Sequence, residues 1–291
     1  MALQLNSPCK INLLLNILGK RADGFHELET VMHPVPLHDV LTLERRDAGI
    51  FLTCNDATLP TDAKNLVYRA AETFLSRHQI ASGVTIHLEK NIPHAAGLGG
   101  GSGDAATTLL GLNQLFDFPA SPESLEQIAA SLGSDIPFFL QNKPALATGR
   151  GEKIRSLDFF PALRGCQIIL AHPGFGISTP WAYQQLAYFP GALKGTAGRA
   201  EKLIALLEKG DLAAAAREFY NSLEAPALCK YPLLKIFQEF FRENGAAATL
   251  MSGSGSATFA LFSEGKSATI ALEKFQSEFG GKIWTALLPL H

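Results

Sequence analysis

Five glycines fall within the seven positions 97–103 of the segment NIPHAAGLGGGSGDAATTLLGLNQLF, which spans residues 91–116. Glycine is costly in regular structure, so such a cluster indicates an unusual backbone path or the close approach of a bulky group. An apolar repeat with helical spacing follows at once. Backbone N–H groups in a glycine loop that opens a helix bind anions, so we expect a phosphate here rather than a purely structural turn. Ser102 adds a hydroxyl that could contact the phosphate or a magnesium ion.

The glycine cluster matches neither of the two common nucleotide fingerprints. No G-x-x-x-x-G-K-[ST] motif occurs anywhere in the chain, and Ser102 stands where the third glycine of a Rossmann motif would be. Asp104, directly after the cluster, suits a helix N-terminus but slightly opposes an anion. The phosphate site that we expect is therefore of another kind.

A lysine and an aspartate are the candidates for acid–base chemistry. Lys10 is a lone cation in the apolar segment SPCKINLLL (7–15), and Asp135 lies in LGSDIPFF (132–139). Taken singly, each has a plainer interpretation: Lys10 on a solvated strand face, and Ser134 or Asp135 as a helix cap. An inward-facing Lys10 would need an acid or a phosphate as its partner, and Asp135 could be that acid and also a general base.

Three further segments carry aromatic groups or hydrogen-bond donors suited to a small ligand. RADGFHE (21–27) places Phe25 and His26 beside an Asp-Gly turn, where they could hold a planar ring. GISTPWAY (176–183) supplies Trp181 and Tyr183, which are otherwise ordinary core aromatics. MSGSGSATFALF (251–262) is longer than a tight hairpin needs and offers several N–H and O–H donors.

Composition excludes several classes of protein. The 291 residues are 47% hydrophobic and 18% charged, with a formal net charge of −2, so no nucleic acid or membrane partner is expected. Four scattered cysteines form no C-x-x-C pair, which argues against zinc and disulfides and fits a reducing compartment. No apolar run is long enough to span a membrane. We therefore expect a cytoplasmic protein.

The elements that must position these residues follow from hydrophobic periodicity. The first half predicts strands and helices in alternation, and the second half opens with a strand and is then mainly helical. Strands are expected at 40–45, 50–54, 84–90, 166–173 and 282–288, with a strand, a glycine turn and a strand within 246–262. Helices are expected at 65–78, 104–116, 121–133, 197–209, 211–224, 231–243 and 266–279. Two α+β domains, 1–160 and 161–291, are the simplest account of this order.

The order of the motifs is more specific than any one of them. PHAAGLGGGSGDAA resembles the phosphate-binding motif of the galactokinase, homoserine kinase, mevalonate kinase and phosphomevalonate kinase (GHMP) superfamily. SPCKINLLLNILGKRADGFHEL, LGSDIPFF and MSGSGSATFALF extend the resemblance from about residue 7 to 262. It implies an N-terminal ribosomal-S5-like domain and a C-terminal ferredoxin-like α/β domain, with the active site in the cleft between them. Because the first motif begins at Ser7, we expect no transit peptide.

The resemblance also implies an activity. RADGFH together with LGSDIPFF is typical of the member that uses ATP to phosphorylate the 2-hydroxyl of a cytidine-diphosphate-linked methylerythritol, in the non-mevalonate route to isoprenoids. Lys10 and Asp135 match its catalytic pair, with Asp135 as the base. The ATP-binding set that the resemblance implies is Pro93, His94, Ala95, Ala96, Gly97, Leu98, Gly99, Gly100, Gly101, Ser102 and Gly103, with Asn65, Leu66 and Lys90 at the adenosine. The implied substrate set is Asn12, Phe25, His26, Thr179 and Tyr183, with Phe25 and Tyr183 stacking on the cytosine.

Three departures from the usual motif are visible. Gly103 replaces a second serine, Phe25 replaces a tyrosine, and His94 and Ala95 replace more typical loop residues. Mg²⁺ is expected only as part of the nucleotide complex, with no assigned protein ligand. The expected partner is a small molecule, and the chain is expected to be a monomer or a homodimer.

Two other readings stay open at this point. A relative could act on another small alcohol, such as homoserine or mevalonate, although neither offers a nucleobase for Phe25, His26 and Tyr183. A non-catalytic RNA-binding protein could share the fold of the N-terminal domain, but the net negative charge and the Lys10/Asp135 pair weigh against it.

Overall fold

The computed structural model describes residues 2–290 and divides them into two compact units. Unit 1 contains the chain up to Cys9, Leu37–Pro93 and Gly99–Asn142. Unit 2 contains Lys10–Pro36, His94–Leu98 and the chain from Lys143 onward. The strands β1 (Leu3–Lys20) and β2 (His26–Arg46) contribute residues to both units. The domain boundary near residue 160 stays a prediction.

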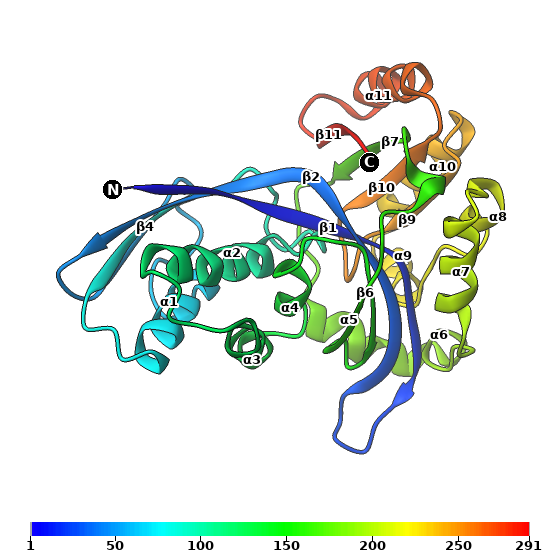
Figure 1. Ribbon diagram of the computed structural model, residues 1–291. Coiled ribbons are helices and arrows are strands. Elements are labelled where there is room, and N and C mark those ends of the chain that lie inside the picture. Colours follow the sequence, from blue (N-terminus) through cyan, green and yellow to red (C-terminus); the bar gives the residue numbers. More distant parts are fainter. Residues whose placement is uncertain (1, 291) are drawn as a thin grey trace. The chain divides into compact units, whose positions relative to one another are not determined.

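Unit 1 combines strands with four helices. The strand β4 (Gly83–Glu89) pairs antiparallel with residues 40–46 of β2 and parallel with β3 (Ile50–Cys54). The helices α1 (Leu66–Arg77), α2 (Gly100–Leu115), α3 (Pro122–Leu132) and α4 (Ile136–Phe139) lie on one side of these strands (Figure 1). Their apolar faces bury Phe74, Leu109 and Leu112 completely, so the hydrophobic effect holds the helices to the strands.

Unit 2 contains an antiparallel sheet in the order β11-β7-β10-β9. Its strands are β7 (Gln167–His172), β9 (Ala248–Met251), β10 (Thr258–Phe262) and β11 (Trp284–Pro289). The helices α10 (Pro232–Glu243) and α11 (Gly265–Phe279) pack against it through an aromatic cluster in which Phe241 and Phe275 stack with ring centroids 4.7 Å apart. Figure 1 shows both helices beside these strands.

The rest of unit 2 surrounds the long strands. Residues 28–32 of β2 pair with β5 (Ala145–Gly149), which pairs in turn with β6 (Lys153–Ser156), while Leu14 and Leu15 of β1 pair parallel with β8 (Tyr220–Asn221). The other elements are helical. They are η1 (Pro161–Leu163), α5 (Thr179–Gln185), η2 (Leu186–Tyr188), α6 (Pro190–Leu193), α7 (Arg199–Glu208), α8 (Leu212–Ala216) and α9 (Glu224–Lys230).

Most predicted elements are confirmed, but the prediction of one helix is wrong in its second part. The helix expected at 211–224 ends at Ala216, and the chain then forms β8. The Asn221 side chain donates to the backbone oxygens of Met251 and Gly253 at 2.8 and 2.7 Å. The alanines form α8 as their helix propensity predicts, whereas these long-range bonds and the pairing with β1 hold residues 220 and 221 in a strand.

Candidate functional site

The glycine cluster forms a turn and the first turn of a helix. Gly99 is the N-cap residue of α2 in a left-handed conformation with φ 71°, and the helix begins at Gly100, four residues earlier than expected. Gly103 donates the first helical hydrogen bond, to the oxygen of Gly99 at 2.9 Å. The N–H groups of Gly100, Gly101 and Ser102 precede that bond, so they are available to an anion at this helix end.

The preceding part of the loop, His94–Leu98, belongs to unit 2 and is held by backbone contacts there. Ala257 N–H donates to the oxygen of Ala96, and Lys10 N–H to that of Leu98, both at 2.9 Å. A Cβ at Gly97 would lie 2.0 Å from the backbone oxygen of Ser252, so only glycine fits this approach. The glycine-serine turn after β9 thus connects two strands and also packs on the predicted phosphate loop.

Lys10 faces inward, not onto a solvated strand face. The residue is only 3% exposed. Its ammonium donates to the Asn12 Oδ1 atom and, at 2.9 Å, to the backbone oxygen of Gly97. Gly97 also accepts from the Ser252 hydroxyl at 3.0 Å. The structure therefore brings Lys10 and Asn12 together with residues 94–98 of the predicted phosphate loop within unit 2.

Three residues predicted at the adenosine lie in unit 1, two of them beside the start of α2. Asn65 is the N-cap of α1 and accepts from the Val67 N–H at 2.9 Å. A Cβ at Gly101 would lie 3.9 Å from Leu66 Cδ1, and one at Gly100 would lie 3.3 Å from Lys90 Nζ. The side chains of Leu66 and Lys90 therefore lie beside the predicted phosphate loop, whereas Asn65 is shown as the cap of α1 and its contact with adenosine stays a prediction.

Lys90 belongs to a buried ion triad that the sequence did not reveal. Its ammonium contacts Asp39 Oδ2 and lies 2.8 Å from Asp104 Oδ2, and all three side chains are at most 7% exposed. Burial lowers the pKa of Lys90, but attraction from Asp104 and Asp39 outweighs it, so the pKa lies above its ordinary value. Burial raises the pKa of Asp104 to about 7 against the opposing pull of Lys90. Asp104, in the first turns of α2, thus forms an ion pair with Lys90.

The predicted cytosine site is partly assembled. The His26 and Tyr183 rings lie with centroids 5.2 Å apart, tilted by 41°. Burial, followed by the nearby charge of Lys20, lowers the pKa of His26, which favours the neutral imidazole at neutral pH. Phe25 is 53% exposed and has the Arg150 guanidinium 4.6 Å from its ring centroid. The sandwich of Phe25 and Tyr183 stays a prediction.

Thr179 and Asp135 stand at helix ends. Thr179 opens α5, and its hydroxyl lies 2.8 Å from that of Ser254 in the glycine-serine turn. Asp135 occupies the N-cap position of α4, but its carboxylate accepts no capping hydrogen bond from the described residues that follow it. The capping interpretation is therefore not supported for Asp135, and the pairing of Asp135 with Lys10 stays a prediction.

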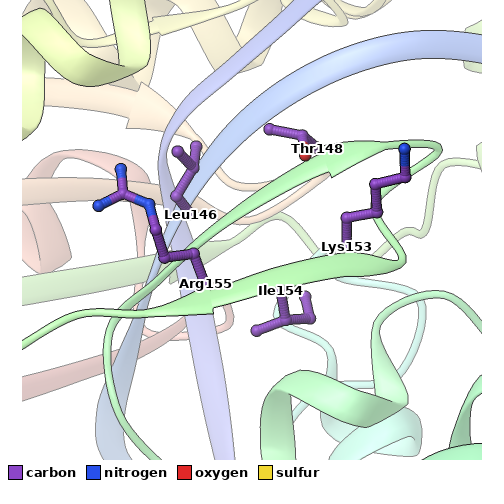
Figure 2. A pocket seen from close by; sticks show the side chains of 5 residues that line it. All are labelled: Leu146, Thr148, Lys153, Ile154 and Arg155. Carbon is purple, nitrogen blue, oxygen red and sulfur yellow. The ribbon is translucent and has the colours of Figure 1, made fainter.

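One open cavity of about 310 Å³ lies at the hairpin of β5 and β6 in unit 2 (Figure 2). Its lining residues are Leu146, Thr148, Lys153, Ile154 and Arg155, and none of them belongs to the predicted site. Among residues 2–290 no group of three or more histidine, cysteine or acidic side chains is arranged to hold a metal ion. Within the same residues, no helix is both long and apolar enough to cross a bilayer.

Comparison with known proteins identifies relatives over nearly the whole chain. The GHMP kinases N terminal domain matches residues 65–143, and the GHMP kinases C terminal domain matches residues 203–281. The 4-diphosphocytidyl-2-C-methyl-D-erythritol kinase of Syntrophomonas wolfei is 41% identical over 280 residues, 94% of each chain. The enzyme of that name from Synechococcus sp. (strain JA-3-3Ab) is 43% identical over 265 residues, 89% of this chain and 85% of its own.

Solved structures agree with these sequence matches. A crystal structure of 4-(cytidine 5'-diphospho)-2C-methyl-D-erythritol kinase superposes with a TM-score of 0.82 at 35% identity, covering 99% of this chain and 100% of its own. The homoserine kinase of Cytophaga hutchinsonii has a TM-score of 0.76 at 20% identity, covering 100% of this chain and 94% of its own, which shows the fold alone. The expected α+β fold with N- and C-terminal parts is confirmed.

Proposed function

Because the chain belongs to the 4-diphosphocytidyl-2-C-methyl-D-erythritol kinases of the GHMP superfamily, we propose that Lys10 and Asp135 carry out its phosphoryl transfer. The enzyme is an ATP-dependent small-molecule kinase. It transfers the γ-phosphoryl group to the 2-hydroxyl of 4-(cytidine 5'-diphospho)-2-C-methyl-D-erythritol, in the non-mevalonate route to isoprenoids.

The ATP phosphates lie against residues 93–103 in this proposal, and the adenosine lies toward Asn65, Leu66 and Lys90. Support comes from the N–H groups at the start of α2 and from the position of Leu66 and Lys90 beside Gly101 and Gly100. Mg²⁺ enters with the nucleotide, where it offsets the charge of the phosphates. Ser102, in the first turn of α2, is the one hydroxyl-bearing residue of segment 93–103.

The cytidyl group is recognised by His26, Phe25 and Tyr183, with Asn12 and Thr179 on the rest of the substrate. A neutral imidazole has one donor and one acceptor nitrogen, so His26 can hydrogen-bond the edge of a cytosine. The adjacent Tyr183 ring supports this assignment, because a nucleobase needs an aromatic face on which to stack. Homoserine and mevalonate would leave these rings unused.

In the transfer step, Asp135 accepts the proton of the attacking hydroxyl, and Lys10 offsets the charge near the transferring group. The contact that carries this proposal is the hydrogen bond from the buried Lys10 ammonium to the Gly97 oxygen, inside the phosphate loop. A lysine costs free energy to bury, so a position fixed on this loop indicates a functional charge.

The direct test replaces Asp135. In Asp135→Asn we expect the rate of ATP-dependent phosphorylation of the cytidyl substrate to fall about a hundredfold or more, the usual scale for losing a general base. ATP affinity, measured by calorimetry, should survive, because the carboxylate is not one of the phosphate donors. Ser134→Ala is the matched control, since it changes the neighbouring exposed residue and should leave turnover intact. Near-normal turnover in Asp135→Asn would remove Asp135 from the mechanism.

Organisation and location complete the proposal. We place the domain boundary near residue 160, which lies between the segments matched by the two family domains. We propose a monomer or homodimer in the cytoplasm, without nucleic acid or membrane partners. The four cysteines form no disulfide among the described residues, which supports a reducing compartment.

A further inference from the structure

Thr30, on strand β2, is a buried residue that the mechanism above does not use. Thr30 is 5% exposed, and its hydroxyl lies 2.6 Å from the backbone oxygen of Leu14 on β1. A carbonyl oxygen can only accept, so the Thr30 hydroxyl must donate its proton to Leu14. The lone pairs of the Thr30 oxygen then remain free to accept a hydrogen bond from another group.

That group is the Asn12 amide. Asn12 Nδ2 donates to the Thr30 oxygen at 2.8 Å, and the residue is 3% exposed. With its nitrogen on Thr30, the amide must present its oxygen on the other side, where Oδ1 accepts from the Lys10 ammonium. The reversed amide would place N–H donors against an ammonium, which has donors only. The direction of the whole chain of hydrogen bonds is therefore set at Thr30.

The chain of bonds ends on the phosphate loop. Besides Asn12 Oδ1, the Lys10 ammonium donates to the Gly97 oxygen at 2.9 Å, so these two acceptors orient it. A Cβ at Gly253 would lie 3.2 Å from Lys10 Nζ and 2.9 Å from the Gly97 oxygen, so the glycine-serine turn also lies close to this contact. A change in the direction of the Asn12 amide would remove the Asn12 acceptor from the Lys10 ammonium.

We propose that Thr30 is a positioning residue for Lys10: its hydroxyl fixes the Asn12 amide so that an oxygen faces the catalytic ammonium. The proposal rests on the proposed function, because it assumes that Lys10 acts in the transfer. It assigns to Thr30 no contact with ATP or with the substrate. The role depends on the hydroxyl and not on the shape of the side chain.

The test compares Thr30→Val with Thr30→Ser in the full chain. Thr30→Val keeps the shape but removes the hydroxyl, so kcat should fall roughly tenfold to a hundredfold, the scale for a displaced reacting group, while KM for ATP stays nearly unchanged. Thr30→Ser keeps the hydroxyl and should restore most of kcat. Equal losses in both variants, or wild-type kcat in Thr30→Val, would overturn the proposal.

Two controls separate positioning from general stability and from the proposed function itself. Thr108 of α2 is also buried and donates to a backbone oxygen, that of Asp104, at 2.7 Å. Thr108→Val should lower the melting temperature as Thr30→Val does but keep kcat, and an equal loss of kcat would contradict a specific role. Lys10→Met should abolish turnover, and an active Lys10→Met would sink the proposed role of Lys10 instead. If Thr30→Val lacked a native melting transition, Thr30→Ala would take its place in the same comparison.

Discussion

At the scale of single residues, Gly103 brings a helix against a strand. A Cβ at this position would lie 2.4 Å from the backbone oxygen of Pro8 and 3.1 Å from the hydroxyl of Ser7. Pro8 belongs to β1, so the missing side chain allows α2 to lie directly on that strand. The replacement of the second serine by Gly103 is therefore a packing feature of this chain.

Gly103→Ala should destabilise unit 1. The added methyl group has to displace backbone, and overpacking of this kind costs about 1–3 kcal/mol. Urea unfolding followed by circular dichroism measures the change in the free energy of unfolding. Gly101→Ala is the matched control in the same helical turn, because its Cβ would meet only Leu66 Cδ1 at 3.9 Å. Equal stability of the two variants would show that α2 can move away from Pro8.

Residue types near the phosphate loop could be predicted from the sequence, whereas their partners could not. Lys10 could be predicted as a candidate because its cation interrupts an apolar segment, and in the structure Lys10 is buried. Thr30 and Asp39 gave no signal, because their partners Asn12 and Lys90 lie 18 and 51 positions away in the chain. Buried hydrogen bonds of this kind depend on strand pairing, which a local pattern does not encode.

At the scale of elements, the triad of Asp39, Lys90 and Asp104 joins three of them. Asp39 lies on β2, Lys90 directly follows β4, and Asp104 lies in α2. Asp39 Oδ1 also accepts from the N–H groups of Asn91 and Ile92 at 2.6 and 2.8 Å. The triad therefore fixes the segment that leads into the phosphate loop as well as the helix that follows.

Lys90→Met should destabilise the protein by about 3–5 kcal/mol, because it leaves two buried carboxylates without their cation. Chemical denaturation measures this loss. In the double variant Lys90→Met with Asp104→Asn, Asp39 is the one carboxylate of the triad that remains, so part of the stability should return. A double variant as unstable as the sum of both single variants would contradict electrostatic coupling within the triad.

The start of α2 and the extent of β2 illustrate what periodicity misses at this scale. The glycines made residues 100–103 look like a loop, yet they are the first helical turn, in which Gly103 allows the close approach to Pro8. Only 40–45 of β2 was predicted, since its buried first half lacks an alternating pattern and contains Pro34 and Pro36. Well-punctuated elements such as α3, with Ser121 as its cap, were predicted to within one residue at each end.

At the scale of the whole molecule, Glu224 links stability to pH. Burial raises the pKa of its carboxyl to about 7, although hydrogen bonds from Met251 N–H at 2.8 Å and from Gln238 lower it. The folded pKa lies above the ordinary value of 4.5, so the contribution of Glu224 to stability is fully present below about pH 4.5. It is lost as the pH rises through about 7, at an order of a few kcal/mol.

Glu224→Gln should remove this dependence, because a neutral amide oxygen can accept both hydrogen bonds at every pH. Thermal unfolding of both proteins from pH 5 to pH 8 gives the difference in melting temperature. We expect the variant to gain on the wild type as the pH rises and the gain to level off above about pH 7. A difference that does not change with pH would mean that Glu224 keeps an ordinary pKa.

The chain passes several times between its two units, and this limits how the protein can be cut into fragments. The backbone passes from one unit to the other after Cys9, Pro36, Pro93, Leu98 and Asn142. No single cut of the gene therefore yields either unit as a continuous polypeptide. A fragment ending near residue 160 would carry Leu14 and Leu15 without β8, their parallel partner. A chimera made from two relatives should therefore take paired strands such as β1 and β8 from the same parent.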